Sequence, residues 1–126
     1  MIRRPWRHRN LLESFIGAFR GVVIILKHER YAKLVGFSGI LIILFAVTLN
    51  ISLIEIAVLV TAITMVLLAE IFNAAVENIL NIVKPYRDHH VKVLKEVSAG
   101  MVLLASFGAA ITGCLILLPK IILILK

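Results

Sequence analysis

The stretch AEIFNAAVENILN, residues 69–81, places two carboxylates and three amides inside an otherwise apolar segment. With 100° per residue on an α-helix, Glu70, Asn73, Glu77 and Asn81 lie at about 0°, 300°, 340° and 20°, on one narrow stripe. A charged side chain at the centre of a bilayer costs about 2.5 to 3.5 kcal/mol on insertion scales, so such groups usually have a function. The stripe is therefore the candidate functional site. An alternative stays open, in which the carboxylates pair with a neighbouring subunit or mark the point where the helix leaves the bilayer.

The helical rise between Glu70 and Glu77 is about 10 Å. This separation suits a ligand with a charged head and a reacting end better than one metal ion held by both carboxylates. A helix that begins near Ser52, a candidate N-cap with Glu55 three residues on, can run unbroken to about residue 83, before Pro85. Glu77 would then lie near the membrane interface and Glu70 about two turns deeper.

The composition indicates a membrane protein. Of the 126 residues, 61% are hydrophobic, and the mean hydropathy is +1.04, which is too apolar for an ordinary soluble domain. Three long stretches lack Asp, Glu, Lys and Arg: 34–54, 56–69 and 97–119. We therefore expect one membrane-embedded domain over 1–126, with spans at about 31–50, 52–83 and 92–119.

A further helix is expected before the first span, at about 9–28. Its apolar residues recur with a helical period while polar residues occupy the other positions; the apolar set is Leu11, Leu12, Phe15, Ile16, Phe19, Val22, Val23 and Leu26. Such an amphipathic helix lies in the membrane interface with its apolar face inward. The expected fold is an all-α membrane protein with three transmembrane helices and an N-terminal surface helix.

The net charge of +7 is distributed as the positive-inside rule describes. Eight Lys or Arg lie in 1–33 and four in 81–96, whereas the link at 50–55 has none. The N-terminus and the 81–96 loop are therefore expected in the cytoplasm of a multi-pass protein, and the 50–55 link and Lys126 on the other side. No RNA-binding or helix-turn-helix pattern supports a nucleic-acid partner.

The motif around the stripe resembles the signature of the prokaryotic diacylglycerol kinase and undecaprenol kinase family. That signature reads E-x-x-N-[ST]-A-x-E followed by K-D, and this chain has EIFNAAVE at 70–77 and Lys95-Glu96 eighteen residues after Glu77. Glu29 falls where the family has an acid just before its first span. The resemblance covers the chain from about residue 14 to the end.

The resemblance implies a homotrimer in the bacterial inner membrane that transfers the γ-phosphate of ATP to a lipid hydroxyl with Mg²⁺. Glu70 would orient or deprotonate the lipid hydroxyl, and Asn73 would help to position lipid and nucleotide. Glu29 and Glu77 would hold Mg²⁺ on the ATP phosphates. Lys95 and Glu96 would also contact the nucleotide. Because Glu29 lies on a different helix from the stripe, we expect protomers to share the site. These roles fit a reaction that depends on positioning, metal ions and cations.

The chain departs from the family pattern at several positions. Ala74 replaces Ser or Thr, Asn81 replaces Asp, and Glu96 replaces Asp. Residues 86–88 read YRD where many members have EYH. Glu96 keeps the charge but is one methylene longer, so the departure bears on its nucleotide role more than on that of Lys95.

Two questions stay open at this point. Glu70 and Glu77 could instead line an ion or proton pathway in a non-enzymatic oligomer. Glu29 and Lys95 argue for a nucleotide site, because a pathway needs neither an additional acid nor a lysine at the cytoplasmic edge. Within the kinase interpretation, the acceptor could be undecaprenol or diacylglycerol.

Overall fold

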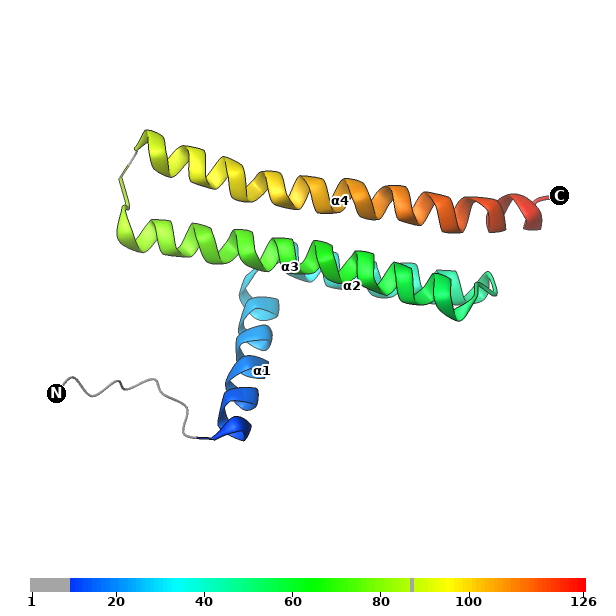
Figure 1. Ribbon diagram of the computed structural model, residues 1–126, viewed down its shortest axis with the longest axis horizontal. Helices are drawn as coiled ribbons and strands as arrows, with labels where there is room; N and C mark the ends of the chain where they lie inside the picture. Colours follow the sequence, from blue (N-terminus) through cyan, green and yellow to red (C-terminus); the bar gives the residue numbers. More distant parts are fainter. Residues whose placement is uncertain (1–9, 87) are drawn as a thin grey trace.

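The computed structural model describes residues 10–86 and 88–126, and this part of the chain is all α-helical. The helices are α1 (Leu11–His28), α2 (Arg30–Thr48), α3 (Leu53–Val83) and α4 (His89–Ile124). The last three run alongside one another, and α1 projects away from them (Figure 1). Each of α2, α3 and α4 is long and apolar enough to cross a membrane. The expected fold class is therefore confirmed. The basic segment 1–9 and Arg87 lie outside the described residues.

A single residue, Glu29, connects α1 to α2. Its backbone is extended (φ −89°, ψ 115°), its N–H donates to the carbonyl of Ile25 at 2.8 Å, and its carbonyl accepts from the N–H of Lys33 at 3.2 Å. Glu29 thus ends one helix and starts the next, which allows the abrupt change of direction. The apolar face of α1 is not buried in the chain: Leu11 and Phe15 are 93% and 75% exposed. That face is free to enter a membrane interface.

The turn between α2 and α3 has the predicted cap. Asn50 adopts φ 51°, a left-handed conformation that Asn tolerates better than most residues. The Ser52 hydroxyl accepts from the Glu55 N–H at 3.2 Å, and the Glu55 carboxylate accepts from the Ser52 N–H at 2.6 Å. This capping box starts α3, whose 31 residues give a length of about 46 Å, well beyond the roughly 30 Å of hydrocarbon.

The helix α4 is longer at both ends than the expected span of 92–119. It begins at His89 because the Asp88 carboxylate accepts hydrogen bonds from the N–H groups of His90 and Val91, at 2.7 and 3.4 Å. It continues through Pro119 to Ile124. A proline removes one helical hydrogen bond, a loss that transmembrane helices tolerate, and the apolar residues after it extend the same segment.

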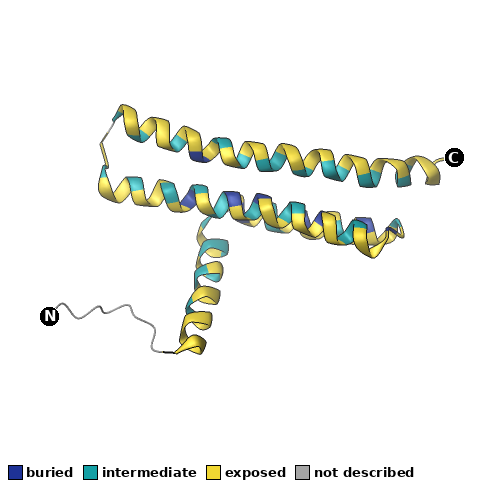
Figure 2. Cartoon of the chain, viewed as in Figure 1, coloured by how far each residue is buried: buried dark blue, intermediate teal, exposed yellow. Residues whose placement is uncertain are grey.

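The three long helices share a buried core near the α2–α3 turn. Ala46, Ile51 and Leu59 form the buried core there, and the Lys120 ammonium of α4 lies 3.7 Å from the Glu55 carboxylate of α3. Farther along, α2 approaches α3 at Gly39, where an added Cβ would lie 2.5 Å from Cγ2 of Ile63. Elsewhere most residues of the helices are exposed or half-buried (Figure 2), and many of the exposed ones are large and apolar, as expected of a surface that meets lipid or another chain.

Candidate functional site

The helix α3 is continuous through the stripe, so its polar residues keep their predicted spacing. Glu70 and Asn73 are half-buried, whereas Glu77 and Asn81 are exposed. The stripe thus passes from a partly covered position toward the open end of the helix. At that end, α3 and α4 extend beyond the point where α1 joins α2 (Figure 1). With α1 in the membrane interface, the part that carries Asn81 would project out of the bilayer.

Glu29 approaches the inner part of the stripe. The half-buried carboxylate of Glu29, at the junction of α1 and α2, lies within electrostatic range of Glu70. The two acids thus act on each other within one chain, and the sharing of a site between protomers stays a prediction.

The helix α4 supplies a lysine and a serine to the other side of the stripe. The Lys95 ammonium donates to the side-chain oxygen of Asn81 at 3.0 Å. The Ser98 hydroxyl lies 2.7 Å from Oδ1 of Asn73 and 3.0 Å from the carbonyl oxygen of Lys95. Lys95 thus lies beside the stripe, as its predicted role requires. Ser98 is 3% exposed and is not among the predicted site residues. Its position one turn after Lys95, on the same face of the helix, could have indicated that it lies at the site.

Glu96 has a different surrounding from Lys95. Its carboxylate lies 3.7 Å from the ammonium of Lys92, one turn earlier on the same helix, and both side chains are largely exposed. An exposed pair of this kind contributes about 0.3 to 0.5 kcal/mol. The structure therefore connects Lys95, but not Glu96, to the stripe residues by a hydrogen bond.

A hollow of about 670 Å³ lies where the chain passes from α3 to α4. We call it the loop hollow. It contains more basic than acidic side chains and is lined by Asn81, Lys84, Pro85, Tyr86, Asp88, His89, Val91, Lys92, Lys95 and Glu96. A lysine-rich hollow beside carboxylates at the open end of the helices can accept an anionic ligand such as a phosphate. Asn81 and Lys95 belong both to this hollow and to the stripe contacts.

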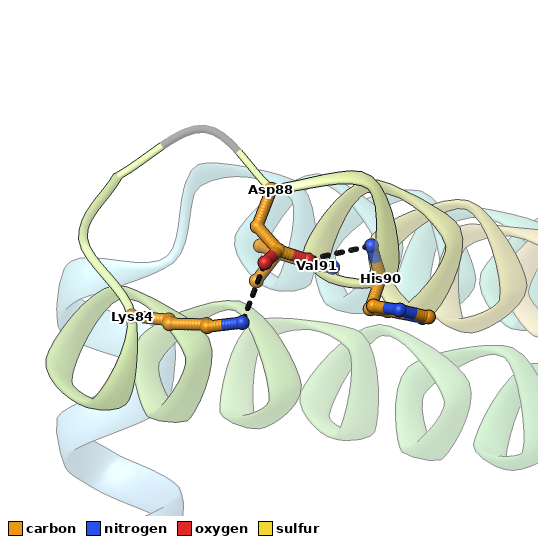
Figure 3. A network of polar contacts seen from close by, with 4 residues as sticks. All are labelled: Lys84, Asp88, His90 and Val91. Carbon is orange, nitrogen blue, oxygen red and sulfur yellow. Dashed lines mark hydrogen bonds and ion pairs between the residues drawn. The ribbon is translucent and has the colours of Figure 1, made fainter.

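The loop beside the hollow is held by Asp88 (Figure 3). Its carboxylate accepts from the Lys84 ammonium and from the backbone N–H groups of His90 and Val91. The Lys84 hydrogen bond, followed by that of the His90 N–H, holds the pKa of Asp88 below its ordinary value. The Lys84 ammonium also lies 5.8 Å from the ring centre of Tyr86. Asp88 is therefore a structural group of the loop.

The described part of the chain contains no cluster of three His, Cys, Asp or Glu side chains that could hold a metal. His89 and His90 meet edge to face, with ring centres 6.1 Å apart. A metal ion bound at the candidate site would therefore need ligands beyond the protein, such as phosphate oxygens and water, in addition to one or two carboxylates. Mg²⁺ is commonly bound in this way.

Comparison with known proteins assigns the chain to a family. The sequence profile of the prokaryotic diacylglycerol kinase family matches residues 17–117. The chain belongs to this family. The matched range contains the four stripe residues and the other residues to which the resemblance gives a role: Glu29, Glu70, Asn73, Glu77, Asn81, Lys95 and Glu96.

A curated relative supports the same assignment. A protein named diacylglycerol kinase from Synechocystis sp. is 33% identical to this chain over 114 residues. The alignment covers 90% of this chain and 65% of the relative, so this member of the prokaryotic diacylglycerol kinase family spans about two-thirds of that protein's length.

Proposed function

We propose that the protein is a lipid kinase of the bacterial inner membrane that transfers the γ-phosphate of ATP to a lipid hydroxyl with Mg²⁺. Family membership supports this proposal. The structural observation that carries it is the contact of Lys95 with Asn81, which brings a cation from α4 to the acidic stripe of α3. Phosphoryl transfer needs such cations near the developing charge, together with positioned carboxylates.

We propose that each end of the stripe binds one of the two substrates. Glu77, Asn81 and the loop hollow lie toward the open end, where ATP would arrive from water, and Lys95 would contact its phosphate oxygens. We propose that Asn73, Glu29 and Glu96 also contact the nucleotide. Glu70 lies deeper and half-buried, where a lipid hydroxyl would arrive from the bilayer. The stripe would thus span the boundary between an aqueous and a lipid substrate.

The residues also fit the metal that the family implies. Glu29 and Glu77 would hold Mg²⁺ through carboxylate oxygens, the ligands that this ion prefers. When bound, Mg²⁺ would neutralise charge on the ATP phosphates. The two carboxylates lie on different elements, the α1–α2 junction and α3, so they could approach the phosphates from two sides.

Glu70 would perform the proton transfer. Its carboxylate would take the proton of the lipid hydroxyl as the lipid oxygen forms a bond to the γ-phosphorus. The bond from that phosphorus to the β,γ-bridging oxygen would break, and ADP would leave. Asn73, one turn away on the same stripe, would position the lipid hydroxyl and the phosphoryl group with its amide. The acceptor would be diacylglycerol or undecaprenol, both lipid alcohols.

We also propose a homotrimer with sites shared between protomers. The exposed apolar surfaces of α2, α3 and α4 support association in the bilayer, and three helices alone cover a polar stripe poorly. Crosslinking in mild detergent should give trimers, and only monomers would refute the assembly. Mixing inactive Glu29→Gln and Glu70→Gln chains should restore activity if Glu29 of one protomer serves Glu70 of another, whereas no recovery in reassembled mixtures would refute this sharing.

The function is tested with detergent-solubilised protein and [γ-³²P]ATP. We expect transfer of label to undecaprenol or diacylglycerol, dependent on Mg²⁺, and the ratio of the two rates identifies the acceptor. No labelling of either lipid by the well-folded protein would refute the proposal. Proton or ion flux in liposomes without phosphate transfer would instead support the acidic pathway.

A further inference from the structure

Ser98 differs from five other hydroxyl side chains of the long helices. Hydroxyls of Ser38, Thr48, Thr61, Thr64 and Thr112 donate to carbonyls three or four residues earlier in their own helices. Ser98 also reaches its own helix, at the carbonyl of Lys95, but its shorter contact, 2.7 Å, crosses to Asn73 on α3. It is 3% exposed, so this contact is largely shielded from water. A hydrogen bond in such a site is stronger and better defined than one at the surface.

In this contact the oxygen end of the Asn73 side chain faces Ser98 on α4. A carboxamide has an oxygen acceptor at one end and two N–H donors at the other. With Oδ1 on the Ser98 hydroxyl, the N–H donors are left for other groups. Donors are what the anionic oxygens of a phosphoryl group need, whereas a flipped amide would present its oxygen to them and repel them.

We propose that Ser98 is a positioning residue, which holds the Asn73 carboxamide with its NH₂ group available to the phosphoryl oxygens during transfer. This role rests on the lipid kinase function proposed above. Ser98 acts through Asn73 and does not itself touch the substrates. Its second contact, to the carbonyl of Lys95, connects the same hydroxyl to the residue whose ammonium would bind phosphate.

The kinetic test uses Ser98→Ala, Ser98→Thr and a control. Loss of one hydrogen bond that orients the amide should lower kcat about 3- to 10-fold. Ser98→Thr keeps the hydroxyl and should restore most of kcat. Thr112→Val removes a hydroxyl that donates within α4 to the carbonyl of Gly108, and it should leave kcat near that of the wild type.

A double-mutant comparison separates positioning from general packing. If Ser98 acts through Asn73, adding Ser98→Ala to Asn73→Ala should cause no further loss of kcat. Multiplicative losses in the double variant, or a normal kcat for Ser98→Ala alone, would overturn the role of Ser98.

A spectroscopic readout keeps this proposal separate from the lipid kinase proposal. The side-chain amide resonance of Asn73, assigned in ¹⁵N-labelled protein with Asn73→Ala, should shift in Ser98→Ala and not in Thr112→Val. An unshifted resonance would overturn the contact and the positioning role. The resonance could shift although the wild-type protein phosphorylates no lipid. That result would confirm the contact but refute both the kinase function and the positioning role that depends on it.

Discussion

The ammonium of Lys95 on α4 donates a 3.0 Å hydrogen bond to the side-chain oxygen of Asn81 on α3. Asn81 replaces the aspartate of the family pattern, but its amide still supplies the oxygen that holds the lysine. Because an amide is neutral, it does not cancel the positive charge of Lys95, which stays available to an anion in the loop hollow.

Replacing Lys95 with methionine should therefore weaken the use of ATP. A charge-assisted hydrogen bond is worth about 1.5 to 3 kcal/mol, so kcat/KM for ATP should fall roughly 10- to 100-fold in Lys95→Met. The matched control is Lys27→Met, which removes an exposed lysine of α1. Phosphate transfer to lipid measured at varied ATP checks this. Equal kcat/KM for the Lys95 variant and the control would contradict the role.

Gly39 should be sensitive to even a small side chain. The Cβ of Gly39→Ala would lie 2.5 Å from Cγ2 of Ile63, and a β-branched side chain moves little because its χ1 is restricted. Overpacking of this kind costs about 1 to 3 kcal/mol, so the melting temperature in detergent should fall. Adding Ile63→Ala should relieve the clash. Gly36→Ala is the control, since its Cβ would have no neighbour within 4 Å, and an equal fall there would refute the close approach.

The membrane orientation can be tested by cysteine labelling. In a Cys114→Ala background, Tyr86→Cys in the loop should react with an impermeant maleimide only in inverted vesicles, because the basic N-terminal segment and the loop are expected in the cytoplasm. Lys126→Cys should react only in intact spheroplasts. The reverse pattern would refute the orientation, and labelling of both sites from one side would refute the crossing of the membrane by α4.

The loop should lose order in acid. The pKa of Asp88 is held below its ordinary value of 3.8, chiefly by the Lys84 hydrogen bond, so its stabilising effect is complete above that pH and is lost as the pH falls through the lowered pKa. Amide protection factors of His90 and Val91 should therefore drop below about pH 4. Asp88→Asn can still cap α4 but cannot titrate, and its protection should be flat over this range. An identical drop in both proteins would contradict the assignment.

Local signals predicted most of the fold. Ser52 and Glu55 set the start of α3, and Pro85 lies just beyond its end. The helix α4 begins three residues before the expected span of 92–119, because the Asp88 side chain caps its first turn. It ends five residues beyond that span, because Pro119 does not interrupt a helix whose apolar residues continue past it.

The site was predictable only along one helix. Periodicity placed Glu70, Asn73, Glu77 and Asn81 on a stripe, since that depends on helical geometry alone. The approach of Glu29 to Glu70, and of Ser98 to Asn73, depends on how helices cross, which no local pattern encodes. Glu96 illustrates the same limit, because it follows Lys95 directly but pairs with Lys92.

Replacing Glu77 and replacing Glu70 should change the kinetics of the enzyme in different ways. Glu77 is exposed toward the open end and would hold Mg²⁺ with ATP, so Glu77→Gln should raise the Mg²⁺ and ATP concentrations required and also lower turnover. Glu70, half-buried and about 10 Å along the helix, would take the proton of the lipid hydroxyl. Glu70→Gln should therefore lose mainly kcat, about 10²- to 10⁴-fold, with Mg·ATP binding largely intact. Mg·ATP affinity and kcat of each variant are measured in the same bicelles, with Glu13→Gln on α1 as the control. Near-normal kcat in Glu70→Gln, or unchanged Mg²⁺ dependence in Glu77→Gln, would show that these roles are wrong even for an active kinase.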